Sequence, residues 1–157
     1  MGDDVMARIV AAVELGRGGE REAARRALGV LWDEMGGDGD PFHQCVLAHF
    51  MADLQDDGRA ELEWDERALV AVASVTDERA REYDSSLQVR GFMPSLYLSL
   101  ADDHRRLGDA ERAREFLERA RSVSDALGDD PYGTTVKNAM EGITKALAEG
   151  STDPLPG

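Results

Sequence analysis

Hydrophobic residues recur every three or four positions along most of the chain, and this spacing predicts amphipathic α-helices. The clearest run extends from Pro94 to Leu127, where two helical stretches meet at Gly108. Glycine enters the left-handed conformation without a steric cost, so Leu107-Gly108 predicts the end of the first helix. Asp109 is a good N-cap, because its side chain accepts a hydrogen bond from the first turn of the next helix. This run is therefore predicted to form a helical hairpin.

The same periodicity divides the rest of the chain into further helices, separated by loops rich in glycine and aspartate. We expect three hairpins and a final helix, over about residues 3–36, 42–76, 85–127 and 132–148. Residues 150–157 are expected to form a disordered tail.

Residues 76–93 allow two interpretations. The segment TDERAREY either continues the helix before it or begins a short helix capped by Thr76. The apolar residues that follow favour a helix that begins near Ser85 and is kinked at Pro94, because proline removes one backbone donor.

The run that begins at Pro94 resembles a tetratricopeptide repeat. Counted from Pro94, the family's preferred residues or acceptable substitutes are Tyr97, Leu100, Ala101, Gly108, Ala113, Leu117 and Ala120. His104 stands where the family usually has tyrosine, and no proline closes the unit. The resemblance implies an all-α fold, a right-handed α-solenoid of about three hairpins in one domain over residues 1–149. The helix over 132–148 would cover the last hairpin as a cap.

The resemblance also implies a concave groove lined by the first helix of each hairpin. The family positions that face such a groove correspond to Ser95, Leu98, Ser99, Asp102, Arg105 and Arg106 in the third hairpin, and to His49 and Ala52 in the second. If the groove holds an acidic peptide, Arg105 and Arg106 are the expected contacts, since arginine offers a planar fork suited to carboxylates. The competing interpretation pairs both arginines with neighbouring aspartates.

Composition narrows the classes of partner. The net charge of −14 argues against nucleic acid, which needs clustered cations. The apolar runs are all shorter than the roughly 20 residues of a membrane span, so no membrane partner is expected. A single cysteine, Cys45, excludes an intramolecular disulfide and favours the cytoplasm. Sixteen Arg against two Lys, with abundant Ala, Gly and Asp, indicate a GC-rich bacterial genome.

Residues that could carry catalysis do not form a recognisable pattern. His49 and Asp53 lie four residues apart and could share a ligand with the neighbouring hairpin, but metal sites normally have three or four protein ligands at characteristic spacing. Adjacent carboxylates on one helix do not show the cleft that acid–base catalysis needs. We therefore expect no enzyme activity, no metal and no cofactor.

The predicted function is a non-enzymatic interaction module that binds a peptide or helix of another protein in its groove. Two alternatives stay open. One is a self-associating accessory subunit, a possible homodimer, with the apolar first helix as its interface. The other is a regulatory domain that senses a small molecule.

Overall fold

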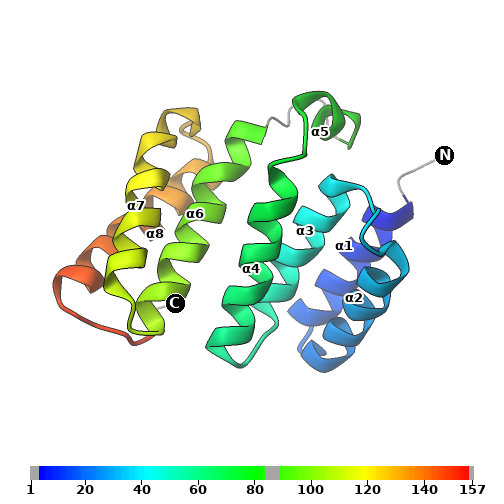
Figure 1. The fold of residues 1–157 in the computed structure, drawn as a ribbon, viewed down its shortest axis with the longest axis horizontal. Coiled ribbons are helices and arrows are strands. Elements are labelled where there is room, and N and C mark those ends of the chain that lie inside the picture. The colour runs from blue at the N-terminus through cyan, green and yellow to red at the C-terminus, as the bar shows by residue number, and fades with distance from the viewer. Residues whose placement is uncertain (1–3, 84–88, 156–157) are drawn as a thin grey trace. The chain divides into compact units, whose positions relative to one another are not determined.

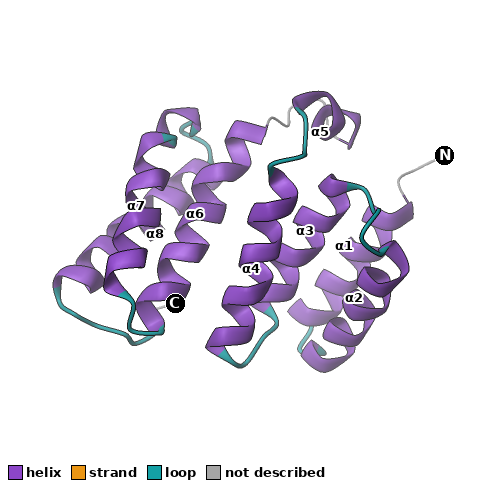
Figure 2. Ribbon diagram, in the orientation of Figure 1, coloured by secondary structure: helices purple, strands orange, loops and turns teal. Residues whose placement is uncertain are grey.

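The structure is a computed structural model that describes residues 4–83 and 89–155, and over these residues the chain is helical, without strands (Figures 1 and 2). The all-α prediction is therefore confirmed for the described residues. They contain eight α-helices and one short 3-10 helix, one α-helix more than expected. The chain forms two compact units, residues 1–87 and 88–157, called here the N-terminal and C-terminal units. The expected single domain over residues 1–149 stays a prediction.

The N-terminal unit contains two antiparallel hairpins and a short fifth helix. Its helices are α1 (Asp4–Arg17), α2 (Arg21–Met35), α3 (Pro41–Asp53), α4 (Gly58–Val72) and α5 (Asp77–Tyr83). Gly19, with φ of 95°, turns the chain between α1 and α2. An aspartate caps each helix of the second hairpin. Asp40 accepts a hydrogen bond from the backbone N–H of Phe42 at the start of α3, and Asp57 accepts one from that of Ala60 at the start of α4. Both helices of the second hairpin thus begin after an aspartate that caps their first turn.

Aliphatic side chains form the core of this unit. Ile9 of α1, Leu28 of α2 and Leu47 of α3 are fully buried. The two hairpins also meet through tryptophans, because the rings of Trp32 in α2 and Trp64 in α4 contact edge to face at 5.1 Å.

Helix α5 resolves the first part of the ambiguous segment. The Thr76 hydroxyl accepts a hydrogen bond from the N–H of Arg79, so the short capped helix is correct. The Arg79 side chain then donates to Asp40 Oδ2 at 2.7 Å and lies over the ring of Phe42. These contacts hold α5 against the start of α3. Residues 84–88, where the next helix was predicted to begin, lie outside the described residues.

The C-terminal unit contains the hairpin that was most clearly predicted. It is formed by α6 (Val89–Arg106) and α7 (Ala110–Ser122), followed by the 3-10 helix η1 (Ser124–Ala126) and α8 (Pro131–Ala148). Pro94 lies inside α6, as predicted. Gly108 has φ of 89° at the turn, and Asp109 accepts from the N–H of Arg112, which confirms both expected signals.

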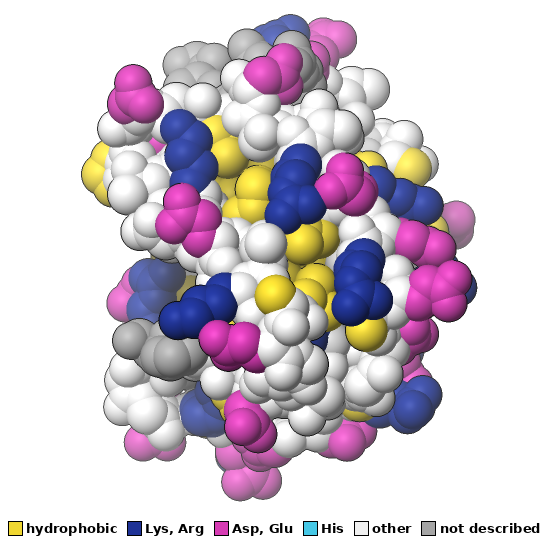
Figure 3. All heavy atoms as spheres, turned by 90° about the vertical axis from the view of Figure 1, so that its left-hand side faces the viewer, with side chains coloured by type: hydrophobic (Ala, Val, Ile, Leu, Met, Phe, Trp, Pro, Cys, Tyr) yellow, Lys and Arg dark blue, Asp and Glu magenta, His cyan; other side chains and the backbone are white. Residues whose placement is uncertain are grey.

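The core of this unit combines leucine with small residues. Leu100, Ala113 and Ala120 have no exposed surface, and α8 adds Ile143. Phe116 of α7 stacks on His104, the residue at the family's tyrosine position, with ring centroids 5.6 Å apart. The outward side of α7 is charged. Figure 3, turned toward α7 and α8, shows Lys and Arg beside acidic side chains around a band of hydrophobic atoms.

The disorder expected for residues 150–157 stays a prediction, and those of them that the structure describes make contacts with their own unit. After α8, Gly150 adopts φ of 68° and the N–H of Ser151 bonds to the Ala146 carbonyl, which turns the chain back. Arg105 then donates to the Ser151 carbonyl at 2.9 Å. A buried guanidinium group needs acceptors, and the Ser151 carbonyl is one of the acceptors of Arg105.

Within the described residues, no helix is both long and apolar enough to cross a membrane.

The packing of α8 against the preceding loop yields a stability prediction. A Cβ at Gly133 would overlap the backbone carbonyl of Gly128, so Gly133→Ala requires the loop to move. We expect a loss of about 1–3 kcal/mol in the free energy of unfolding, measured by urea denaturation. The control is Gly142→Ala in the same helix, where the new methyl would meet only Leu155 at ordinary contact distance. That variant should be neutral or more stable by up to about 1 kcal/mol. Equal changes in the free energy of unfolding for the two variants would refute the close contact between Gly133 and the Gly128 carbonyl.

Candidate functional site

The predicted groove positions of the third hairpin all lie on α6 in the C-terminal unit. Leu98 and Arg105 are buried, while the remaining positions are half-buried: Ser95, Ser99, Asp102 and Arg106. Four of the six predicted positions are thus partly exposed, and two are buried.

The two arginines of α6 are engaged within their own unit. Arg105 is only 2% exposed and donates from Nε and Nη2 to Asp102 Oδ1, at 3.1 and 2.7 Å. Arg106 donates to the other oxygen of Asp102 at 2.9 Å and to Asp103 at 3.0 Å. One carboxylate thus holds both guanidinium groups. These contacts are the ones expected from the competing interpretation, in which the arginines pair with neighbouring aspartates.

The predicted positions of the second hairpin lie on α3 in the N-terminal unit, and they differ from each other. Ala52 is buried in the helical packing and offers no surface. The His49 side chain is about one third exposed, and its Nδ1 lies 3.7 Å from Oδ1 of Asp65 on α4. That distance exceeds a hydrogen bond, and neither atom has a hydrogen-bond partner among the described residues.

The neighbouring carboxyl groups raise the pKa of His49. Burial alone would lower the pKa of His49, but interaction with the Asp65 carboxyl group, helped by the charge of Asp53, outweighs burial and raises it. The pKa of Asp53 is raised as well, first by desolvation and then by Asp65 and Glu61, against the attraction of His49 and Arg21. An imidazole is therefore held among carboxyl groups between α3 and α4.

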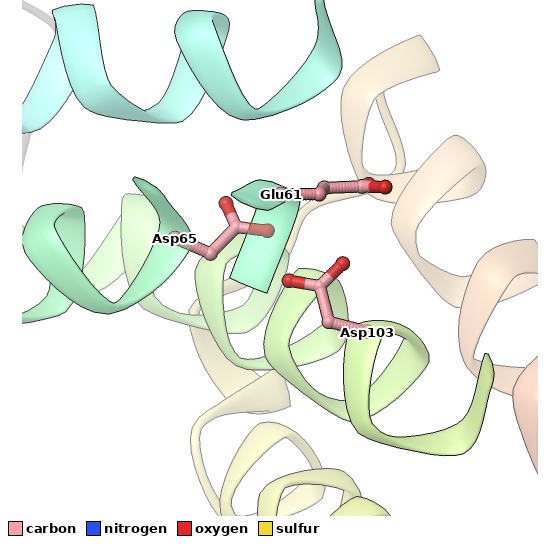
Figure 4. Close-up of side chains that lie close together, drawn as sticks. All are labelled: Glu61, Asp65 and Asp103. Carbon is pink, nitrogen blue, oxygen red and sulfur yellow. The ribbon is translucent and has the colours of Figure 1, made fainter. Parts of the chain in front are cut away.

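The carboxyl groups that act on this histidine come from α3 and α4: Asp53 is the last residue of α3, and Asp65 lies on α4. Figure 4 shows Glu61 and Asp65 one turn apart on α4, and Asp103 on α6. Of the three residues labelled in Figure 4, Glu61 and Asp65 belong to the N-terminal unit, which also contains His49, and Asp103 belongs to the C-terminal unit. As metal ligands, His49 and Asp65 would supply two donor atoms, whereas structural and catalytic zinc sites use three or four protein ligands.

A pocket of the N-terminal unit lies between α1 and α3. It has a volume of about 190 Å³ and is lined by Val13, Gly16, Arg17, Arg21, Phe50, Asp53 and Leu54. The apolar side chains give it a hydrophobic lining, and two arginines and one aspartate give it charge. The absence of a side chain at Gly16 leaves room here, because a Cβ would lie 3.0 Å from Leu54 Cδ2.

The arginines of the pocket are exposed and each has an acidic neighbour. Arg17 lies 3.2 Å from Glu14, and Arg21 lies 3.3 Å from Asp56, which also accepts from Arg25. Exposed pairs of this kind are weak and exchange readily. Both guanidinium groups therefore remain able to donate to a bound group.

Sequence reasoning missed most of this arrangement. It noted that His49 and Asp53, four residues apart on one helix, could share a ligand with the neighbouring hairpin, but it did not single out Asp65 among many carboxylates. It also gave no binding role to Phe50 of α3 or Arg21 of α2, because only the packing of these two helices with α1 brings both residues to one pocket.

Comparison of the chain with protein-family models, with curated proteins and with solved structures found no match. The function is therefore inferred from the arrangement of the side chains.

The His49–Asp65 pair predicts a pH dependence. We expect NMR titration of the His49 ring to give a pKa above the ordinary 6.5, and Asp65→Asn to lower it. A raised folded-state pKa stabilises the protein below about pH 6.5 and loses this effect as pH rises through the folded value. His49→Gln should therefore cost more stability near pH 6 than near pH 9, measured by urea unfolding. An unchanged His49 titration in Asp65→Asn would refute the coupling.

Proposed function

We propose that this protein is a non-enzymatic interaction module that binds a peptide or helix of another protein. In this proposal its three hairpins form a tetratricopeptide-like, right-handed solenoid, and α8 covers the last hairpin. The observation that carries the proposal is the pocket between α1 and α3, the first helices of two successive hairpins in the N-terminal unit.

The size of the pocket favours a peptide over a metabolite. Sites for small molecules usually enclose about 300–1,000 Å³. The pocket holds about 190 Å³, enough for one large side chain. A peptide that inserts one apolar anchor gains hydrophobic burial there, while the rest of the peptide lies along the helices.

The charges at the pocket favour contacts to the peptide backbone. Arg17 and Arg21 carry donors at the rim, and their acidic neighbours already offset their positive charge. Peptide carbonyls beside the anchor can accept from these guanidinium groups without adding another charge. We therefore propose a ligand with an apolar anchor, held by Val13 and Phe50 and oriented by the two arginines.

Self-association is the second candidate, and exposed aliphatic side chains favour it. Val10 and Leu15 on α1 and Val30 on α2 are all more than 40% exposed. A second copy could cover them and give a homodimer. Measurement of mass at several concentrations, with wild type and Val30→Asp, separates this candidate from peptide binding: a dimer lost in the variant would support it.

The peptide-binding proposal predicts a difference between two valine substitutions. Val13→Glu places a carboxylate in the pocket lining, whereas Val70→Glu makes the same change on α4 at a side chain that is 75% exposed. Peptides selected from a random phage-displayed library on the wild type should bind Val13→Glu at least about tenfold more weakly, as the loss of one buried anchor implies. Their affinity for Val70→Glu should be unchanged, and both variants should melt as cooperatively as the wild type. Selected peptides that bind all three proteins equally would refute the role of this pocket.

A further inference from the structure

The chain carries an extended segment of its own on the C-terminal unit. After α8, residues 151–155 (Ser-Thr-Asp-Pro-Leu) run without helical structure. Two contacts hold the ends of this segment. Its first carbonyl accepts from Arg105 on α6, and its last side chain, Leu155, is half-buried.

The leucine contact depends on a glycine of α8. A Cβ at Gly142 would lie 3.6 and 3.7 Å from the two terminal carbons of Leu155. The bare backbone at Gly142 therefore leaves a shallow place on the helix in which Leu155 rests. A methyl group there would keep ordinary contact, but a larger side chain would take the place of the leucine.

The middle of the segment makes no comparable contacts with the unit. Thr152, Asp153 and Pro154 are exposed, and the Asp153 N–H bonds locally to the Ser151 hydroxyl. The segment is thus held by one backbone carbonyl and one leucine four residues later. These two features belong to many extended peptides, and neither requires the segment to be covalently joined to α8.

Asp102 orients the guanidinium group of Arg105 independently of residues 151–155. Asp102 fixes two of its donor atoms, which leaves Nη1 directed at the Ser151 carbonyl. Orientation by a neighbouring carboxylate lowers the entropy lost when the third donor binds an acceptor. One predicted groove residue thus makes the contact with a peptide backbone that a peptide-binding surface requires.

We infer that the surface formed by Arg105 of α6 and Gly142 of α8 is a binding site for an extended peptide, and that residues 151–155 occupy it as an intramolecular ligand. A peptide in trans with the same chemistry, a free carbonyl followed four residues later by leucine, competes for this surface. The chain's own segment has the advantage of an effective concentration in the millimolar range, so competition requires its release. This site and the α1–α3 pocket belong to different units, and the inference does not depend on the role proposed for the pocket.

The test uses the full-length chain, labelled with ¹⁵N, and the synthetic peptide EGSTDPLPG, which copies residues 149–157. Leu155→Asp removes the leucine contact and should release the segment. Thr152→Asp is the matched control, because it adds the same charge at an exposed position of the same segment. Leu155→Ala serves as a second release variant, and cooperative melting confirms that each protein is folded.

The peptide at about 2 mM should shift amide resonances of α6 and α8 in both Leu155 variants, with an affinity at least about tenfold higher than for wild type or Thr152→Asp. A peptide with aspartate in place of its leucine should cause no shift. The inference would be overturned if the peptide shifted none of the four proteins, or all four equally.

Discussion

Close contact between helices at alanine and glycine is the constraint on which both units depend. Aromatic residues are only 6% of the chain, so large rings fill few of the contacts between helices. Ala24 in α2, Ala68 in α4 and Ala113 in α7 are instead completely buried, each on the second helix of its hairpin. Small side chains allow the backbones to approach, and the surrounding leucines then fill the remaining space at interior packing density.

The same constraint explains where the candidate binding surfaces lie. Gly16 approaches both Ala24 and Leu54, and the space that its missing side chain leaves is part of the α1–α3 pocket. Gly142 on α8 leaves the place that Leu155 occupies. An arginine is present at both surfaces: Arg21 is exposed and only weakly paired with Asp56, whereas Arg105 is buried and oriented by Asp102. At each surface a glycine leaves room for an apolar side chain and an arginine supplies hydrogen-bond donors. This combination suits an extended chain or a single anchor side chain.

The elements of the fold could largely be predicted, because their signals are local. Gly108 and Asp109 mark the turn between α6 and α7, and Thr76 marks the start of α5; each acts through residues within one helical turn. The site could be predicted only in outline. Arg105 was assigned to a groove, but its burial depends on acceptors in Asp102 and in the distant Ser151. His49 was noted together with Asp53, but its partner Asp65 lies on the other helix of the same hairpin. Nothing in the sequence distinguishes Asp65 from the many other carboxylates.

Urea unfolding of two substitutions in α2 tests the central claim most directly. Ala24→Glu places a carboxylate at a fully buried contact, and Ala27→Glu makes the same change at an exposed position of the same helix. The account predicts a loss of roughly 3 kcal/mol or more for the first, because the charge has neither room nor a partner, and less than about 0.5 kcal/mol for the second. Equal stability of the two variants would contradict the claim that close contact at small residues holds the hairpins together.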